Sequence, residues 1–395
     1  MKTTIAFSIL IFIVATGALI YTQTKTPAAN ALRHSIPAPW SGNERVIPML
    51  QEKLKQEPEN PEWNSALGLA YLQKARETGD PSYYTKADAL FDRALASRRD
   101  HVDALIGRAS LAMSRHEFEQ AREIAERALR LNPDVVATYG VLADAQTELG
   151  DYDAAIKTLQ TMVQKKPNLS SYSRISYMRE LHGDTEGAIQ AMQMAIDAGA
   201  PDAENTAWCM VQLANLYLNS GRLAEAERAN RMALVRFPNY VHALAGLARV
   251  AVAQKDFSAA ARYYKQAADT VLLPEFLIAL GEVYEHMNKP AEAAQQFELV
   301  RAIQKIYRSN GVNTDLEMVL FDLDHGGDIA RALEAARKEW QQRKSMKVAD
   351  AYAWALYRAG RKDEARSMMN QALRLGTKDP LFQRHAAMIE EGIRC

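Results

Sequence analysis

A column of alanines at a nearly constant spacing constrains this chain more than any other feature. The column, whose members lie 33 to 39 residues apart, comprises Ala87, Ala121, Ala155, Ala188, Ala226, Ala260, Ala293, Ala332 and Ala365. A small residue that recurs with a period near 34 is typical of arrays of paired helices. Because one helical hairpin cannot bury its own apolar face, each pair must stack on its neighbours. The sequence therefore predicts an elongated all-α array.

Two further columns of small residues accompany the first. Seven residues after it, on the same helix face, stand Ala94, Ala128, Ala195, Ala233, Ala267 and Ala372. Twelve residues before it, on a preceding helix, stand Ala109, Ala143, Ser176, Ala214, Ala248, Gly281 and Ala353. Glycine, which tolerates the left-handed conformation that ends a helix, separates the two helices at Gly150, Gly183, Gly221 and Gly360. These columns predict closely packed antiparallel helix pairs.

The pattern resembles the tetratricopeptide repeat family. In one unit the matching residues are Tyr139, Leu142, Ala143, Gly150, Tyr152, Ala155, Leu159 and Pro167, and the resemblance runs from about Pro61 to Leu375. It implies a right-handed superhelical solenoid of about eight to nine antiparallel helix pairs. It also implies that the first helix of each pair lines a concave groove, where such arrays bind partners.

The concave groove supplies the candidate site residues. The positions that the resemblance places there hold Asp144, Glu148, Arg174, Tyr177, Gln212, Asn215, Asn219, Arg249, Glu282 and Glu285. From them we take seven as candidate partner contacts: Asp144, Arg174, Tyr177, Gln212, Asn215, Arg249 and Glu282. Side chains of these types suit hydrogen bonding to an extended peptide or a carboxylate. We therefore expect a protein or peptide partner.

Composition and motifs argue against several other classes of function. The 395 residues carry 48 basic and 48 acidic side chains, so no overall positive charge points to nucleic acid. The local basic runs Arg98-Arg99, Lys165-Lys166 and Arg343-Lys344 are typical of solvated helix ends. No phosphate loop, dinucleotide fingerprint or hydrolase motif is present. We expect no enzyme, no cofactor and no nucleic-acid partner.

The N-terminus predicts export. Residues Ile5 to Tyr21 carry no charge and are apolar or small throughout, close to the length that spans a bilayer. We expect a signal peptide or transmembrane anchor over 1–24 and a Pro-containing linker over 25–45. The solenoid with its N-terminal capping helix then occupies 46–379, and a C-terminal capping helix 380–395. Cleaved or not, this segment places the repeats outside the cytoplasm, periplasmic or extracellular.

Alternatives remain open at this point. The expected role is a scaffold for a partner in the groove, in a setting such as cell-envelope or secretion-apparatus assembly. One alternative is a regulatory subunit that acts through its convex or terminal surface, and another is self-assembly through an end repeat. A third is a metal protein using Asp322, Asp324 and His325. Against it, the 322–328 segment suits a helix–turn–helix junction, with Asp328 as the cap.

Overall fold

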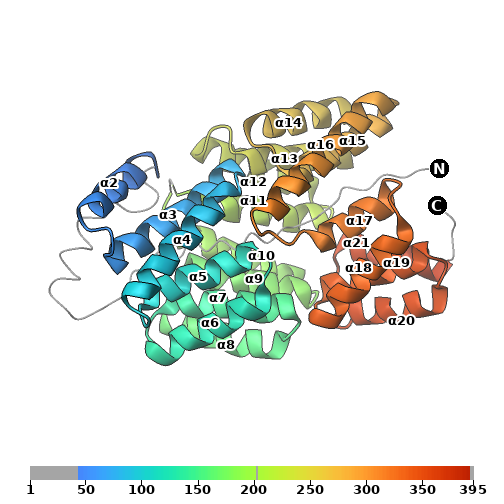
Figure 1. The fold of residues 1–395 in the computed structure, drawn as a ribbon. Coiled ribbons are helices and arrows are strands. Elements are labelled where there is room, and N and C mark those ends of the chain that lie inside the picture. The colour runs from blue at the N-terminus through green and yellow to red at the C-terminus, as the bar shows by residue number, and fades with distance from the viewer. Residues whose placement is uncertain (1–42, 202, 392–395) are drawn as a thin grey trace.

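The chain folds into a stack of helical hairpins. The computed structural model describes residues 43–201 and 203–391, which contain twenty helices and no strand. Nine consecutive pairs run from α3–α4 to α19–α20, with α2 before the first pair and α21 after the last (Figure 1). Each pair packs together and contacts the next pair, through the Phe297 and Phe321 rings where the seventh pair meets the eighth. The predicted all-α solenoid is confirmed, with nine repeats.

The helix bounds follow the predicted period. The first half comprises α2 (Asn43–Gln56), α3 (Pro61–Thr78), α4 (Ser82–Ser97), α5 (Val102–Ser114), α6 (Phe118–Leu131), α7 (Val136–Leu149), α8 (Tyr152–Lys165), α9 (Leu169–Leu181), α10 (Thr185–Asp197) and α11 (Glu204–Asn219). The second half comprises α12 (Leu223–Arg236), α13 (Val241–Ala253), α14 (Phe257–Thr270), α15 (Pro274–His286), α16 (Pro290–Ser309), α17 (Asp315–Asp324), α18 (Ile329–Gln342), α19 (Met346–Arg358), α20 (Lys362–Ala372) and α21 (Pro380–Glu391).

The alanine columns form the contact surfaces between helices. All nine alanines of the first column are at most 3% exposed, and the six alanines of the second column are fully buried. In the first column every member is alanine, so the helices approach closely there and pack to the crystal-like density of protein interiors. The column of small residues thus sets the spacing between the two helices of each repeat.

The turns within the pairs share one backbone conformation even where glycine is missing. Gly150, Gly183, Gly221 and Gly360 have positive φ angles between 72° and 92°, as a helix ending in a left-handed residue requires. The corresponding turns after α5, α13 and α15 place His116, Lys255 and Asn288 in the same region, at φ 62°, 61° and 55°. The repeat geometry therefore dictates the turn, and glycine is its least strained occupant.

The solenoid completes more than one superhelical turn, and the second turn rests on the first. In each of the first four pairs, the turn between the two helices contacts a loop from the second superhelical turn. The turn of the first pair meets the loop after the sixth pair, and the series continues to the turn of the fourth pair and the loop after the ninth. These contacts, which we call the seam, join Gly79 to Val271, Arg115 to Asn313, Leu149 to Lys344, and Gly183 to Gly376. The Lys344 amide donates to the Leu149 carbonyl at 2.8 Å, and the Asn313 amide donates to the Arg115 carbonyl at 3.0 Å.

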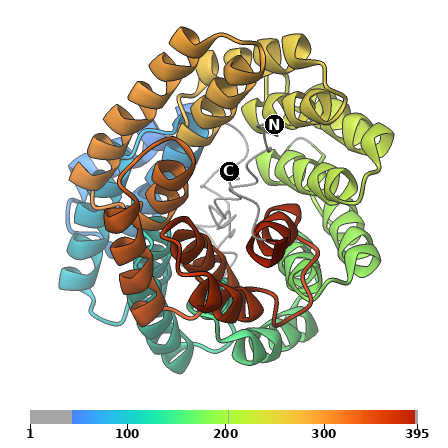
Figure 2. The same ribbon diagram turned by 90° about the vertical axis from the view of Figure 1, so that its right-hand side faces the viewer.

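The closed shape brings distant repeats into one core. Figure 2 shows the helices winding around a ring, with the last helices inside its outline. One hydrophobic cluster joins residues of α7, α8 and α9 to residues of α17 through α21. The Met346 amide donates to the Tyr152 hydroxyl at 2.8 Å across 194 residues of sequence. The C-terminal repeats are therefore part of the body of the protein rather than a free arm.

Both ends of the array are covered. Helix α2 packs on α3 and begins at Asn43, a little before the expected boundary at residue 46, and α21 packs on α19 and α20. The apolar segment and most of the expected linker lie outside the described residues, so both stay predictions. Over the ranges 43–201 and 203–391, none of the helices combines the length and the apolar character that crossing a membrane requires.

Candidate functional site between the two superhelical turns

Two of the predicted groove residues bind each other. Arg174 on α9 donates from Nε to Asp144 Oδ1 on α7 at 2.9 Å and from Nη2 to Oδ2 at 2.7 Å. Arg174 is 6% exposed and Asp144 9%. Burial raises the pKa of Asp144, and the neighbouring guanidinium opposes that rise. Since a buried ion pair is costly to break, this pair fastens α7 to α9 before it serves any partner.

The other predicted residues also lie on first helices of their pairs. Asn215 on α11 is buried and donates to Gln212 Oε1 at 3.2 Å. Burial lowers the pKa of Arg249 and raises that of Glu282 to about 7. Glu282 Oε1 lies 3.5 Å from His325 Nε2. A role of Gln212, Asn215, Arg249 and Glu282 in partner binding stays a prediction.

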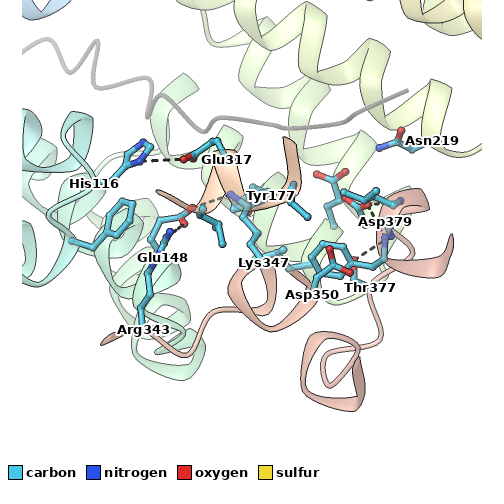
Figure 3. A pocket seen from close by; sticks show the side chains of 17 residues that line it. His116, Glu148, Tyr177, Asn219, Glu317, Arg343, Lys347, Asp350, Thr377 and Asp379 are labelled. Carbon is cyan, nitrogen blue, oxygen red and sulfur yellow. Dashed lines mark hydrogen bonds and ion pairs between the residues drawn. The ribbon is translucent and has the colours of Figure 1, made fainter. Parts of the chain in front are cut away.

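Tyr177, the remaining candidate, lines a cavity of about 100 Å³ between the two superhelical turns. Side chains from α5–α6, α7, α9 and α11 form one wall, and side chains from α17, α19 and the α21 region form the other (Figure 3). Glu148 and Asn219, which the resemblance also placed in the groove, line this cavity as well. We call it the inter-turn cavity. It has the volume for several water molecules or for one small polar group.

At one end of the inter-turn cavity the charges are paired. Glu148 accepts from Lys347 Nζ at 3.0 Å and from Arg343 Nη1 at 3.3 Å. Burial alone would raise the pKa of Glu148, but the two cations outweigh it and hold the pKa below its usual value. Arg343 also lies over the Phe118 ring, 4.7 Å from its centroid. We call this the compensated end; it fastens α19 to α7 across the turns.

At the other end of the inter-turn cavity, the carboxyl groups of Glu180 and Asp379 lie near each other. Burial and the neighbouring Asp379 raise the pKa of Glu180 to about 7, against the weaker opposing effects of Lys347 and of a hydrogen bond from Asn219. Burial also raises the pKa of Asp379, which caps α21 by accepting from the Leu381 amide at 2.8 Å. Within the described part of the chain, neither carboxylate belongs to an ion pair. We call this the acidic end.

The segment 322–328 does not form a common site. Asp322 lies 3.2 Å from Arg331, and Asp324 accepts from the Trp354 indole at 2.9 Å. Asp328 accepts from the Ala330 and Arg331 amides, so the predicted cap of α18 is confirmed. Among residues 43–201 and 203–391, no three His, Cys, Asp or Glu side chains gather in a way that would hold a metal ion.

The sequence did not predict the side chains that the second superhelical turn contributes to the wall of the inter-turn cavity. It predicted a solvated helix end at Arg343, yet Arg343 is 7% exposed and held by Glu148 and Glu339. That reading is wrong because a helix end is solvated only if no other part of the chain covers it. Lys347 and Asp379 carried no signal either, since their partners lie in the first turn, more than 190 residues earlier.

The stacked hairpins and the inner cavity define a superhelical helix-repeat protein. Models of the tetratricopeptide repeat family match residues 83–135, 112–175, 211–271, 246–305 and 348–371. The chain therefore belongs to the tetratricopeptide repeat family. No curated protein matches the sequence.

The chain is similar to several solved structures, one of which superposes well enough to show the same fold. The human IFIT1 dimer with PPP-AAAA superposes with a TM-score of 0.53 at 15% identity, covering 84% of this chain and 78% of that one. The APC/C hetero-tetramer Cut9–Hcn1 gives 0.49 at 13% identity, covering 93% of this chain, which spans 60% of the length of the matched chain. The pilus biogenesis factor PilW gives 0.43 at 17%, covering 51% and 92%. At these identities the likeness concerns the fold alone.

Proposed function

We propose that this protein is a scaffold that binds a protein or peptide partner at the inner surface of its superhelix, with the inter-turn cavity as the contact point. Helical repeat arrays use their extended concave surfaces for binding, and tetratricopeptide repeats are typically non-catalytic. The observation that carries the proposal is the cavity itself. Tyr177, Glu180 and Asn219 are only partly buried there, so a partner can reach them.

The setting follows from the N-terminal segment. The uncharged run Ile5 to Tyr21 favours export or membrane anchoring, so we propose that the repeats act outside the cytoplasm, as part of envelope or secretion-apparatus assembly. Cell fractionation, together with N-terminal sequencing of the mature chain, tests this part. A full-length chain recovered in the cytoplasm would contradict it. The expected absence of a nucleic-acid partner stays a prediction.

A second candidate surface lies on the second helices of the pairs. On α12, Met232 is 54% exposed and Val235 is 81% exposed. Exposed apolar side chains on neighbouring turns of one helix are a feature of interaction surfaces. This observation favours the alternative of a regulatory subunit or a self-assembling chain that acts through its outer face.

Site-specific crosslinking separates the two candidates. A photo-reactive amino acid replaces Asn219 in one variant and Val235 in a matched second variant, both in the full chain in its native cells. Neither position makes an ion pair, so both replacements should leave the fold intact, which circular dichroism and thermal melting check. Crosslinks from position 219 alone support the inner-surface scaffold. Crosslinks from position 235 alone contradict it, and adducts of twice the chain mass at 235 would indicate self-assembly.

Charge reversal of Arg174 is unsuited to this purpose. Replacing the partner of buried Asp144 would leave an uncompensated carboxylate in the core and destabilise the first turn. A lost partner would then report loss of folding rather than loss of a contact. Asn219 is the better position, because its side chain is partly exposed and lies on the cavity wall (Figure 3).

A further inference from the structure

We propose that the acidic end of the inter-turn cavity binds one cationic group, a guanidinium or a primary ammonium, of the kind that an Arg or Lys side chain of a partner presents. This inference rests on the proposed scaffold function and names the chemistry of its partner. It draws on four observations: the charge inventory of the cavity, the convergence of polar atoms at one end, the apolar walls, and the volume.

The charge inventory leaves an acidic surplus. The cavity wall carries the carboxylates of Glu148, Glu180, Glu317, Asp350 and Asp379 against the cations Arg343 and Lys347 and the imidazole of His116. Both cations lie on Glu148. Asp350 is held by His385 Nδ1 at 2.9 Å, where both side chains are almost fully buried.

The surplus lies on Glu180 and Asp379 at the acidic end, and on Glu317, which lies beside His116 on the side of the cavity that holds Glu148 and Arg343 (Figure 3). Glu317 Oε1 is 3.8 Å from His116 Nδ1. Its other oxygen, Oε2, is buried and has no hydrogen-bond partner within residues 43–201 and 203–391. A buried carboxylate oxygen without a donor costs free energy, so a donor supplied from outside would stabilise this wall.

The polar atoms of the acidic end converge from three elements. Glu180 comes from α9, Asn219 from the end of α11, and Asp379 from the residue before α21. Asn219 lies near enough to Glu180 to oppose the rise in the pKa of that carboxyl group. The α21 amides of Leu381 and Phe382 both donate to Oδ1 of Asp379, so Oδ2 is the oxygen left for a ligand. Two carboxylates and an amide facing one space match the several N–H donors of a guanidinium.

The remaining walls fit the stem of a long basic side chain. Leu181, Leu381 and Phe382 line the cavity beside the acidic end. The methylene groups of Arg and Lys pack on apolar surface while the charged head stays with polar groups. A cavity of about 100 Å³ holds such a head group and a few waters.

An anion does not fit the same space. The two basic side chains of the cavity are engaged by Glu148, and any approaching phosphate or carboxylate would face Glu180 and Asp379 at close range. Like charges in a partly buried site repel strongly because screening by water is reduced. The arrangement therefore selects for positive charge.

Proton linkage gives this proposal a second readout. The charged groups that face Glu180 are Asp379 from the α21 side and Lys347 from α19. Together with burial they place the pKa of Glu180 at about 7. A bound cation stabilises the ionised carboxylate, so binding at pH 7 should release part of a proton and should strengthen as the pH rises from 6 to 8.

The test uses a matched pair of probes with the full chain. N-acetyl-arginine amide carries the proposed cation, and N-acetyl-citrulline amide has the same shape without the charge. Isothermal titration calorimetry at pH 7.5, in two buffers that differ in ionisation enthalpy, measures affinity and proton release together. We expect the arginine probe to bind at least about tenfold more tightly than the citrulline probe, a difference of about 1.4 kcal/mol. Equal affinities would overturn the proposal.

Variants locate the site. Glu180→Gln keeps the shape and one side-chain oxygen of Glu180, and Asp379→Asn keeps a capping oxygen for α21; each should lower the affinity for the arginine probe about tenfold or more. Glu364→Gln removes an exposed carboxylate on α20 and should change nothing. Unchanged binding in both cavity variants, with native melting curves, would also overturn the proposal.

Competition distinguishes the two sources of such a cation and separates this inference from the scaffold function. If the arginine probe blocks chemical crosslinking of a partner to the wild-type chain, which keeps Asn219, the cation is a side chain of that partner. If the probe binds without competing, the site serves a free amine, and the cation-site inference still stands. If a partner crosslinks equally well with wild type, Glu180→Gln and Asp379→Asn, and no probe binds, the scaffold function survives and the cation site is wrong.

Discussion

Gly150 and Gly183 occupy the same position in their repeats as Gly221 and Gly360, yet the four glycines have different surroundings. All four adopt left-handed backbone conformations at the turn within a pair. A Cβ atom on Gly150 would collide with the backbone of Lys344, and one on Gly183 would collide with the backbone of the second turn. A Cβ atom on Gly221 or Gly360 would meet nothing within 4 Å.

The difference comes from the superhelix and not from the repeat. Locally, each glycine ends the first helix of its pair. Among residues 43–201 and 203–391, the turns of the first four pairs are the ones that contact a loop of the second superhelical turn. One sequence feature therefore has two structural roles, a helix stop everywhere and a close approach at the seam.

The largest effect is expected from a substitution at the compensated end, whose buried ion pairs lie next to the seam contact between Leu149 and Lys344. Glu148→Gln would remove the carboxylate that Lys347 and Arg343 share, and would leave Arg343 with Glu339 alone, in a site where Glu148 itself is 8% exposed. Removing one partner of a buried pair costs about 3–5 kcal/mol. We expect the free energy of unfolding in urea to fall by that amount. Amide exchange of Lys344, whose N–H crosses the seam to Leu149, should accelerate.

The control for this variant is Glu364→Gln, which removes an ion pair with Arg361 within the exposed surface of α20. Exposed pairs contribute little because water and salt screen them, so no measurable change is expected. If Glu148→Gln lowers the stability but leaves the Lys344 amide protected, the second turn is held by its apolar core alone. The seam would then not depend on the compensated end.

The period of the repeat could be predicted from the sequence, whereas the seam could not. Alanines such as Ala87 and Ala121 each mark the contact between the two helices of their own repeat. The small residues that form such a contact lie within seven to twelve positions of the alanine in the sequence, so a local pattern records them. The pairing of Glu148 with Lys347 spans 199 residues. It depends on a small rotation that accumulates over five repeats, and no local pattern records this rotation. Tyr177 and Asn219 were predictable as inner-surface residues, while Asp379 was not.

A smaller effect is expected from alanine at the two kinds of glycine. Gly150→Ala and Gly360→Ala share the cost of a left-handed residue with a Cβ atom, about 1–2 kcal/mol. Gly150→Ala adds a collision with the Lys344 backbone, and forcing atoms into a packed site typically costs a further 1–3 kcal/mol or so. Urea unfolding should therefore show a larger loss for Gly150→Ala than for Gly360→Ala.

The comparison is informative because each variant controls the other. Equal losses would mean that the seam yields at little cost and that the two turns are only loosely stacked. A pattern in which Gly183→Ala resembles Gly150→Ala, and Gly221→Ala resembles Gly360→Ala, would establish the seam as a property of position in the superhelix.

The smallest expected effect concerns pH, and it contrasts the two ends of the inter-turn cavity. The pKa of Glu180 is raised to about 7 in the folded chain, whereas an unfolded chain has an ordinary glutamate near 4.5. Between these values the folded state holds the proton and the unfolded state loses it. Stability from this group is therefore full below about pH 4.5 and is lost as the pH rises toward 7. Glu148, with its lowered pKa, acts in the opposite direction and loses stabilisation on acidification.

Glu180→Gln removes one of these two opposing effects. Relative to wild type, the variant should gain stability as the pH rises from 5 to 8, by something on the order of 1 kcal/mol, since Glu180 is only partly buried and solvent screens part of the shift. Thermal melting at half-unit pH steps measures this difference. Because burial is the main cause of the raised pKa of Glu180 and Asp379 is the second, an unchanged pH profile would mean that Glu180 is more open to solvent than its place on the cavity wall implies.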